Sequence, residues 1–378
     1  MRDAVFHYLM RIPSLSFREN YLRSVEFRSP EYIPCRIMVT WPLWLAYGEK
    51  LERIYQAHRF VIQPKDLHPS WKDVIKPEGK PYGSHEAQQA IPRVERVLTD
   101  PFGCTWSFNI EGYQGQVVKH PLERWENFKG YSFPDPEEGL PSEGSDKLTP
   151  WGEIAANVER MMSEGKLVQV SLMHGLFFQR LYYLRGFTNL MRDFIQRPPQ
   201  LYELIDGLTR YILDLVDRLL KCGRIDIVYI GDDLGAQTRM PISPSTFREF
   251  IYPSYRKIFG RIRERGVHVY FHSDGHVMEV LDQLIKAGAS VLNIQDRVNG
   301  LENIGALCKG RVCVDIDVDR QYLVPFGKPE EIKSHIKRIV EYLSLKKGGL
   351  MIEAEVHPPT PLANIEALAE AMEENMWL

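Results

Sequence analysis

Six short apolar runs in the second half of the chain each end in an acid, an amide or a histidine. They are Leu167–Met173 before His174, Asp226–Ile230 before Asp232 and Asp233, His268–Phe271 before His272 and Asp274, Ser290–Ile294 before Gln295 and Asp296, Arg311–Val314 before Asp315, Asp317 and Asp319, and Leu350–Ile352 before Glu353 and Glu355. A stretch with helical character follows each run. Apolar strands that alternate with helices predict a parallel sheet, because parallel strands need a crossover connection.

The polar residues at the ends of these runs predict where the chemistry lies. When reactive side chains gather at the carboxyl ends of parallel strands, a (β/α)8 TIM barrel with its active site on that face is the simplest α/β architecture. We expect one such domain over residues 1–378. Residues 151–378 should hold the regular β/α repeats, and residues 1–150 an elaborated N-terminal region with the first strands.

Composition and charge argue against nucleic-acid-binding and membrane proteins. The 378 residues are 44% hydrophobic and 26% charged, and the formal charge of −3 gives no basic field, so nucleic acid is not expected as a partner. No apolar stretch approaches the roughly 20 residues that span a bilayer, and the N-terminus lacks the features of a secretory signal. Five scattered cysteines form no CxxC pair, as expected for reduced, buried thiols. We therefore expect a cytoplasmic protein with no membrane partner.

The segment His272-Ser273-Asp274-Gly275 leaves a strongly apolar run. Residues 272 and 274 point to the same side of a strand, so an imidazole and a carboxylate should converge there. Such a pair can bind a divalent metal, or the carboxylate can orient the histidine for acid–base work. The alternative is that Asp274 caps the next helix and His272 is a core residue.

Two further segments supply candidate catalytic residues: Asp233, Asp232 and His174. Asp232 and Asp233 lie between Gly231 and Gly235, which permit a turn that brings both acids into a site. A buried carboxylate there must be paired, protonated or bound to a metal. The alternative is that one acid caps a helix and the other is solvated. His174 could also form a metal site with Glu138 and Glu153, although Glu153 suits the first turn of a helix.

The last apolar run offers another carboxylate. Glu353 and Glu355 would share a face with His357, and Glu355 could complete a metal site with His272 and Asp274. A capping or solvated acid is the alternative for this strand. Candidates for substrate binding are Gln237, Gln295, Asp317 and Tyr182, the last from a group of aromatic residues that could line a ring pocket or belong to the core.

Several segments together resemble the uroporphyrinogen decarboxylase superfamily, particularly its corrinoid-dependent methyltransferase branch. They are GDDLGAQ, SPSTFREFIYP, FHSDGH, LIKAGAS, the block from FGKPEEI to GGLMIEAEVHPPTPLANIEAL, and the N-terminal TDPFGCTW with GYQGQVVKHPLERWENFKGYSFPDP. The resemblance covers most of the chain and implies a (β/α)8 barrel. The arginine-rich N-terminal segment of the true decarboxylases is not found, which makes decarboxylation the second interpretation.

The resemblance also implies a zinc site, with a departure in its ligands. The methyltransferase branch binds zinc through a histidine, a cysteine two residues later and a cysteine on the last strand. His272 matches the first position, Asp274 replaces the middle cysteine, and no cysteine lies near Glu353–His357. An oxygen-rich set of His272, Asp274 and Glu355 argues against a thiol as the methyl acceptor.

The HSDG and DDLG segments resemble the methyl-ether O-demethylases of corrinoid systems. This implies a methyltransferase that moves a methyl group from a methoxylated, aromatic compound to the Co(I) corrinoid of a partner protein. The leaving oxygen would need a metal as Lewis acid, or a proton from Asp233 or His174. The alternatives are a uroporphyrinogen decarboxylase-like decarboxylase, a methylcorrinoid:thiol methyltransferase, and a catalytically silent tetrapyrrole-binding barrel. The oligomeric state stays open, with a homodimer as one option.

Overall fold

The structure is a computed structural model that describes residues 13–62, 93–110 and 115–378. Its centre is a seven-stranded sheet in which every neighbouring pair is parallel. In sheet order the strands are β1 (Cys35–Val39), β12 (Leu350–Val356), β11 (Cys313–Asp317), β10 (Val291–Gln295), β9 (His268–Ser273), β8 (Ile227–Gly231) and β7 (Gln169–Ser171). On the free side of β1, Ile37 forms a parallel bridge with Ile62, which adds an eighth position to the sheet.

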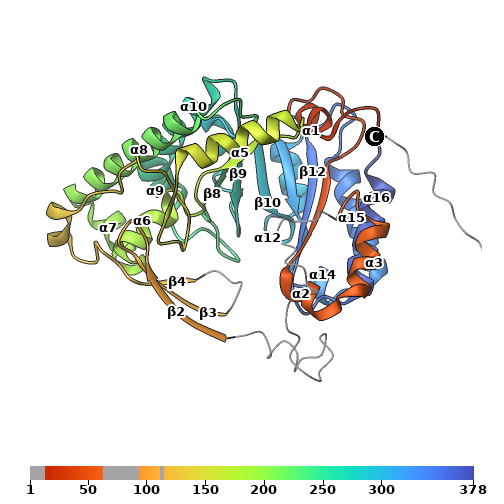
Figure 1. Cartoon of the computed structure of the whole chain (residues 1–378), viewed down its shortest axis with the longest axis horizontal. Coiled ribbons are helices and arrows are strands. Elements are labelled where there is room, and N and C mark those ends of the chain that lie inside the picture. Colours follow the sequence, from red (N-terminus) through yellow and green to blue (C-terminus); the bar gives the residue numbers. More distant parts are fainter. Residues whose placement is uncertain (1–12, 63–92, 111–114) are drawn as a thin grey trace, which may run out of the picture.

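Helices cover the outside of this curled sheet (Figure 1). In the figure, α8 and α10 lie on one side of it, and α3, α15 and α16 lie on the other. The larger helices are α3 (Glu49–Ala57), α5 (Trp151–Ser163), α6 (Phe178–Arg185), α7 (Phe187–Gln196), α8 (Pro199–Leu219), α10 (Tyr252–Arg263), α11 (Leu281–Ala287), α13 (Leu301–Cys308), α15 (Pro329–Leu343) and α16 (Leu362–Asn375). The predicted α/β class and (β/α)8 barrel are thereby confirmed.

The long crossover helix α8 shows why these segments are helical. Its buried residues Leu201, Leu204, Leu208, Leu215 and Leu219 recur at helical spacing and form one apolar stripe against the sheet. The shorter elements are α2 (Trp41–Tyr47), α9 (Pro244–Thr246), α12 (Asp296–Asn299), α14 (Leu323–Phe326), a 3-10 turn (Trp125–Gly130) and a π turn (Phe247–Ile251).

The amino end of the barrel is closed by α1 (Phe17–Val25). Its Tyr21 and Val25 pack against a layer of inward-facing strand residues, namely Ile227, Tyr270, Val291, Cys313 and Met351. Arg18 fixes the helix by a forked contact with Asp226, in which Nε and Nη2 lie 2.8 and 2.6 Å from the two carboxylate oxygens. This helix therefore packs across the end of the barrel opposite the expected active site.

A small antiparallel sheet projects from the barrel near α6 (Figure 1). It consists of β2 (Arg93–Thr99), β3 (Thr105–Ile110) and β4 (Gln116–Lys119), and a two-stranded ladder pairs β5 (Leu140–Pro141) with β6 (Leu148–Thr149). Asp100 joins the small sheet to the barrel, because its Oδ2 accepts hydrogen bonds from the Trp106 indole at 2.9 Å and from Arg180 of α6 at 3.0 Å. Both Asp100 and Arg180 are buried.

All five cysteines are free thiols, and Cys35, Cys104, Cys308 and Cys313 are buried. Burial raises the pKa of the Cys104 and Cys308 thiols to about 12. None of the helices that the structure describes is long and apolar enough to cross a membrane.

Candidate active site

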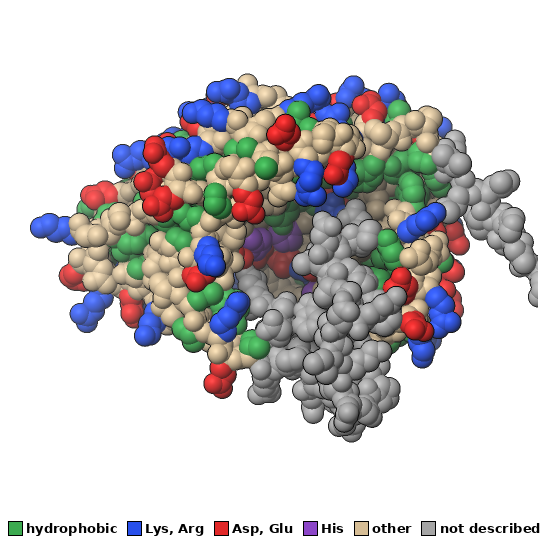
Figure 2. Space-filling view, viewed as in Figure 1, with side chains coloured by type: hydrophobic (Ala, Val, Ile, Leu, Met, Phe, Trp, Pro, Cys, Tyr) green, Lys and Arg blue, Asp and Glu red, His purple; other side chains and the backbone are tan. Residues whose placement is uncertain are grey.

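The barrel encloses a cavity of about 980 Å³. Figure 2 shows histidine and acidic side chains within a hollow at the centre of the molecule. The described residues that line the cavity are Phe17, Arg18, Tyr21, Arg36, Met38, Glu143, Gly165, Lys166, Leu167, Gln169, Ser171, His174, Tyr229, Asp233, His272, Asp274, Asn293, Arg320, Glu353 and Glu355. The cavity therefore extends from α1 up to the carboxyl ends of the strands.

Strand register sets the layer of side chains at the catalytic end. Gly231, His272, Asn293 and Asp315 are consecutive Cα partners across β8, β9, β10 and β11. Since residues in register on neighbouring strands face the same side, their side chains meet inside the barrel. Gly231 has no side chain to contribute, and the His174 ring occupies that space, so a Cβ there would overlap the ring. A glycine in this layer is what admits His174 to the site.

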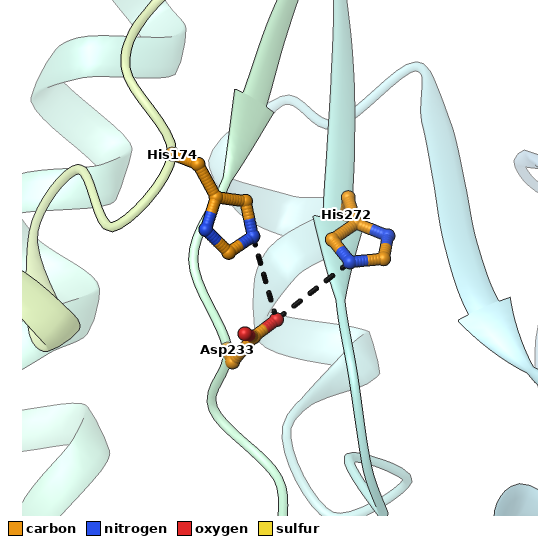
Figure 3. A group of neighbouring side chains, drawn as sticks. All are labelled: His174, Asp233 and His272. Carbon is orange, nitrogen blue, oxygen red and sulfur yellow. Dashed lines mark ion pairs between the residues drawn. The ribbon is translucent and has the colours of Figure 1, made fainter. Parts of the chain in front are cut away.

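Asp233 lies between two histidines that point toward it from different strand ends (Figure 3). Its Oδ1 is 3.7 Å from Nε2 of His174 and 3.7 Å from Nε2 of His272. The Asp274 backbone N–H donates to the same oxygen at 2.9 Å, and the Gln179 amide donates to Oδ2 at 3.2 Å. These bonds fix the carboxylate and aim one oxygen at both rings.

The charges of this group follow from its burial and its neighbours. Burial alone would lower the pKa of His174, but the carboxylates of Asp233 and Glu143 outweigh it and raise the pKa to about 10. Burial alone would raise the pKa of Asp233, but His174 and His272 outweigh it and lower the pKa to about 2. Between the two candidate proton donors of the sequence, His174 therefore holds the proton at neutral pH and Asp233 is ionised.

The orientation of His272 is fixed by an amide on the next strand. Its Nδ1 lies 2.5 Å from Oδ1 of Asn293, whose Nδ2 donates to the Asp315 carbonyl at 2.9 Å. Since the amide oxygen can only accept, Nδ1 carries a hydrogen and Nε2 is the atom left for a ligand. An outer partner of this kind is usual for a histidine that binds a metal.

His174, Asp233 and His272 offer three ligand atoms that all lie within 4.8 Å of one another. Two imidazoles and one carboxylate that face a cavity suit a divalent ion such as zinc, with a coordination position left open for a substrate. This group shares only His272 with the metal site predicted from the sequence.

The other two predicted ligands, Asp274 and Glu355, are held by Arg320. Its Nη2 lies 2.7 Å from each oxygen of Asp274, and its Nη1 lies 2.8 Å from Oε2 of Glu355. Asp274 Oδ1 is nonetheless only 3.6 Å from Nε2 of His272. The predicted trio is therefore close together in space, with a guanidinium bound to its two carboxylates.

The structure gives Asp232, predicted as catalytic, a different place from Asp233. It is buried and accepts hydrogen bonds from the backbone N–H groups of Phe177, Phe178 and Gln179 at 2.7–3.0 Å. The Tyr255 hydroxyl donates to it at 2.5 Å. Asp232 thus caps the N-terminus of α6 and does not line the cavity.

The four predicted substrate-binding residues also lie outside the cavity wall. Gln237 is exposed and bonds to Gln321, while Gln295 supports the HSDG turn through Gly275 N and Asp274. Asp317 is 1% exposed, and Tyr182 packs its ring against Tyr183.

Three site residues were not foreseen from the sequence: Glu143, Asn293 and Arg320. Glu143 comes from the acidic loop, and its Oε2 is 3.3 Å from Nδ1 of His174, whereas Glu138 is exposed and Glu153 lies in the first turn of α5. The only signal for Arg320 was its place just beyond a strand that ends in acids.

Comparison with known proteins places the chain in a family. Residues 96–375 match the family described as Uroporphyrinogen decarboxylase (URO-D). The chain belongs to this family. It is 22% identical over 358 residues to a uroporphyrinogen decarboxylase from Prochlorococcus marinus (strain NATL1A), with 88% of this chain and 96% of that protein covered. It is 20% identical over 293 residues to a uroporphyrinogen decarboxylase from Synechococcus sp. (strain JA-2-3B'a(2-13)), with 75% and 78% covered.

Among solved structures, a methyltransferase from Methanosarcina mazei shares the fold with a TM-score of 0.61 and 16% identity, over 96% of this chain and 99% of that one. The predicted relationship to the uroporphyrinogen decarboxylase superfamily is confirmed, and the chain is an enzyme of that superfamily.

Proposed function

We propose that this family member is a methyltransferase that removes the methyl group from a methoxylated aromatic compound and transfers it to the Co(I) corrinoid of a partner protein. The observation that carries the proposal is that the cavity holds a group that could activate a leaving oxygen and has no cysteine in its wall. The cavity wall holds His174, Asp233 and His272, and none of the five cysteines lines it.

The chemistry requires help at the oxygen. When the C–O bond of a methyl ether breaks, its electron pair stays on oxygen, and the departing oxygen must receive a proton or meet a cation. His174 can donate a proton from Nε2, and Asp233 is placed to hold the imidazolium by its charge. When bound to its partner protein, a Co(I) corrinoid supplies the electron pair that forms the new bond to the methyl carbon.

The same three residues fit a divalent ion. His174 Nε2, Asp233 Oδ1 and His272 Nε2 converge, and Asn293 holds the second nitrogen of His272. Zinc bound there would act as a Lewis acid at the leaving oxygen. A proton and an ion cannot both occupy Nε2 of His174, so metal dependence separates the two modes of activation.

Decarboxylation of a tetrapyrrole acid is the second candidate, favoured by the names of the relatives. A substrate with many carboxylates needs cations that are free to receive them. In the described part of the wall, each cation already has a carboxylate partner. The pairs are Arg18 with Asp226, Arg36 with Asp315 and Glu353, Lys166 with Glu164, and Arg320 with Asp274 and Glu355. This wall suits a neutral methoxyarene better than a polycarboxylate.

The deciding experiment measures methylation of the corrinoid by absorbance, with purified protein, a cognate corrinoid protein and a panel of methoxylated aromatic compounds. We expect a methyl–cobalt spectrum with at least one of them. His174→Gln should lower the rate by about 100-fold or more, the scale of a lost general acid. His58→Gln is the matched control, because His58 pairs with Glu373 away from the cavity and should leave the rate unchanged. Release of CO2 from a tetrapyrrole acid, without methyl transfer from any ether, would replace this proposal by decarboxylation.

A further inference from the structure

Arg320 meets three carboxyl groups from the ends of three strands. The residue lies in the segment that follows β11, and its side chain is only 18% exposed. Besides its contacts to Asp274 and Glu355, its Nη1 lies 3.6 Å from Oδ2 of Asp317. A single nitrogen of the guanidinium, Nη2, contacts both oxygens of Asp274, while Nη1 contacts Glu355, so the charged group links the two carboxylates.

Both oxygens of Asp274 accept hydrogen bonds from this group. Oδ1 accepts from Arg320 at 2.7 Å and from the Gln295 amide at 3.0 Å, while Oδ2 accepts from Arg320 at 2.7 Å. Oε2 of Glu355 is shared between Arg320 and Nε2 of His357, which is 3.3 Å away. A metal ion bound by His272, Asp274 and Glu355 would have to displace the guanidinium or stay beside its positive charge.

Asp233 stands in the opposite situation. It lies as near to His272 as Asp274 does, with 3.7 Å against 3.6 Å from Nε2. Among its described contacts, however, there is no arginine or lysine, only histidines, an amide and a backbone N–H. His272 thus has one carboxylate neighbour that is paired with an arginine, and another whose described partners include no arginine or lysine.

We infer that Arg320 is a positioning residue that acts as a built-in cation. It blocks metal binding at Asp274 and Glu355 and directs a divalent ion to His174, Asp233 and His272. The residue does so through charge and through its contacts with Asp274, without touching that second site. Removing the guanidinium should therefore change which carboxylates bind the ion.

The test is to measure the Co²⁺ affinity of the full chain in titrations that are monitored by visible absorbance and by calorimetry. In the presence of Arg320, Asp233→Asn should weaken Co²⁺ binding by about 10-fold or more, and Asp274→Asn by less than about 3-fold. In an Arg320→Gln background the order should reverse, so that Asp274→Asn is the costly change. Arg297→Gln is the matched control, because Arg297 contacts Asp319 on the exposed side of the same loop.

Each outcome decides the inference. Equal losses for Asp233→Asn and Asp274→Asn with Arg320 present would overturn it, because the ion would then displace the guanidinium. Failure of Arg320→Gln to bring any dependence on Asp274 would overturn it as well. If Arg320→Gln does not fold, the two single variants in the native background and Arg320→Lys, which keeps the charge and should keep the native order, still decide the question. The titrations involve no methyl transfer, so they stand or fall independently of the proposed function.

Discussion

Replacing Asp317 by asparagine should stabilise the protein at neutral pH, although its carboxyl group lies 3.6 Å from an arginine. Asp317 ends β11, is 1% exposed, and neither of its side-chain oxygens has a hydrogen-bond partner. Burial raises its pKa from 3.8 to about 8, against the opposing charge of Arg320 and with support from Asp274, Asp296 and Glu355. At pH 7 the folded protein therefore holds Asp317 in its neutral form.

The size and sign of the effect follow from linkage. Between pH 3.8 and about 8 the folded carboxyl keeps a proton that the unfolded chain has lost, so stability falls as the pH rises. Each pH unit in this window costs about 1.4 kcal/mol, which amounts to at most about 4 kcal/mol at pH 7. Asparagine has nearly the shape of the neutral acid and does not titrate, so Asp317→Asn should avoid this cost.

The assay is urea unfolding at several pH values between 4 and 8, followed by circular dichroism. The two proteins should be equally stable near pH 4, and the variant should gain on the native protein as the pH rises. Asp319→Asn serves as the control on the same loop, because Asp319 accepts backbone hydrogen bonds from Gln321 and Tyr322 and should only lose stability. A variant Asp317→Asn that is less stable at pH 7 would show that Asp317 is ionised and paired with Arg320.

Three further substitutions test other parts of the structure. Asp232→Asn should lower the free energy of unfolding by about 1–3 kcal/mol, measured in urea, because one of its two buried acceptor oxygens becomes an amide nitrogen that faces N–H donors; an unchanged midpoint would refute its capping role. Gly231→Ala should push the His174 ring aside and weaken Co²⁺ binding by about 10-fold or more, whereas native affinity would show that the ring has other room. Arg18→Gln should cost about 1–2 kcal/mol at pH 7. The arginine and a backbone hydrogen bond outweigh burial and lower the pKa of Asp226. The stabilisation is therefore fully present above pH 3.8 and should be lost as the pH falls through the lowered pKa of the folded protein. A loss that does not depend on pH would contradict this reasoning.

The sequence was sufficient to predict what depends on local periodicity. The order of strands and helices follows from apolar runs and helix ends, and the alternation along β9 correctly places His272 and Asp274 on one wall. The same reasoning could not separate Asp232 from Asp233. That choice depends on the N-terminus of α6, whose unpaired N–H groups lie far away in sequence and reach only one of the two acids.

Contacts between distant strand ends could not be predicted from the sequence either. Arg320 links Asp274 to Glu355 across residues that are 46 and 35 positions away along the chain. Glu143 reaches His174 from a loop that resembles solvated surface in composition. Such pairs depend on barrel closure, which sets the distances between strands, and no local pattern encodes them.

The contact between Asp100 and Arg180 bears on how variants of the small sheet should be interpreted. Helix α6 is secured at its N-terminus by Asp232 from the barrel and along its length by Asp100 from outside it. The turn that leads into this helix carries His174. A substitution that loosens β2–β4 can therefore shift α6 and, through it, the His174 imidazole in the cavity. Lost activity in such a variant would not by itself locate a substrate or a partner on that sheet, and the position of His174 should be checked first.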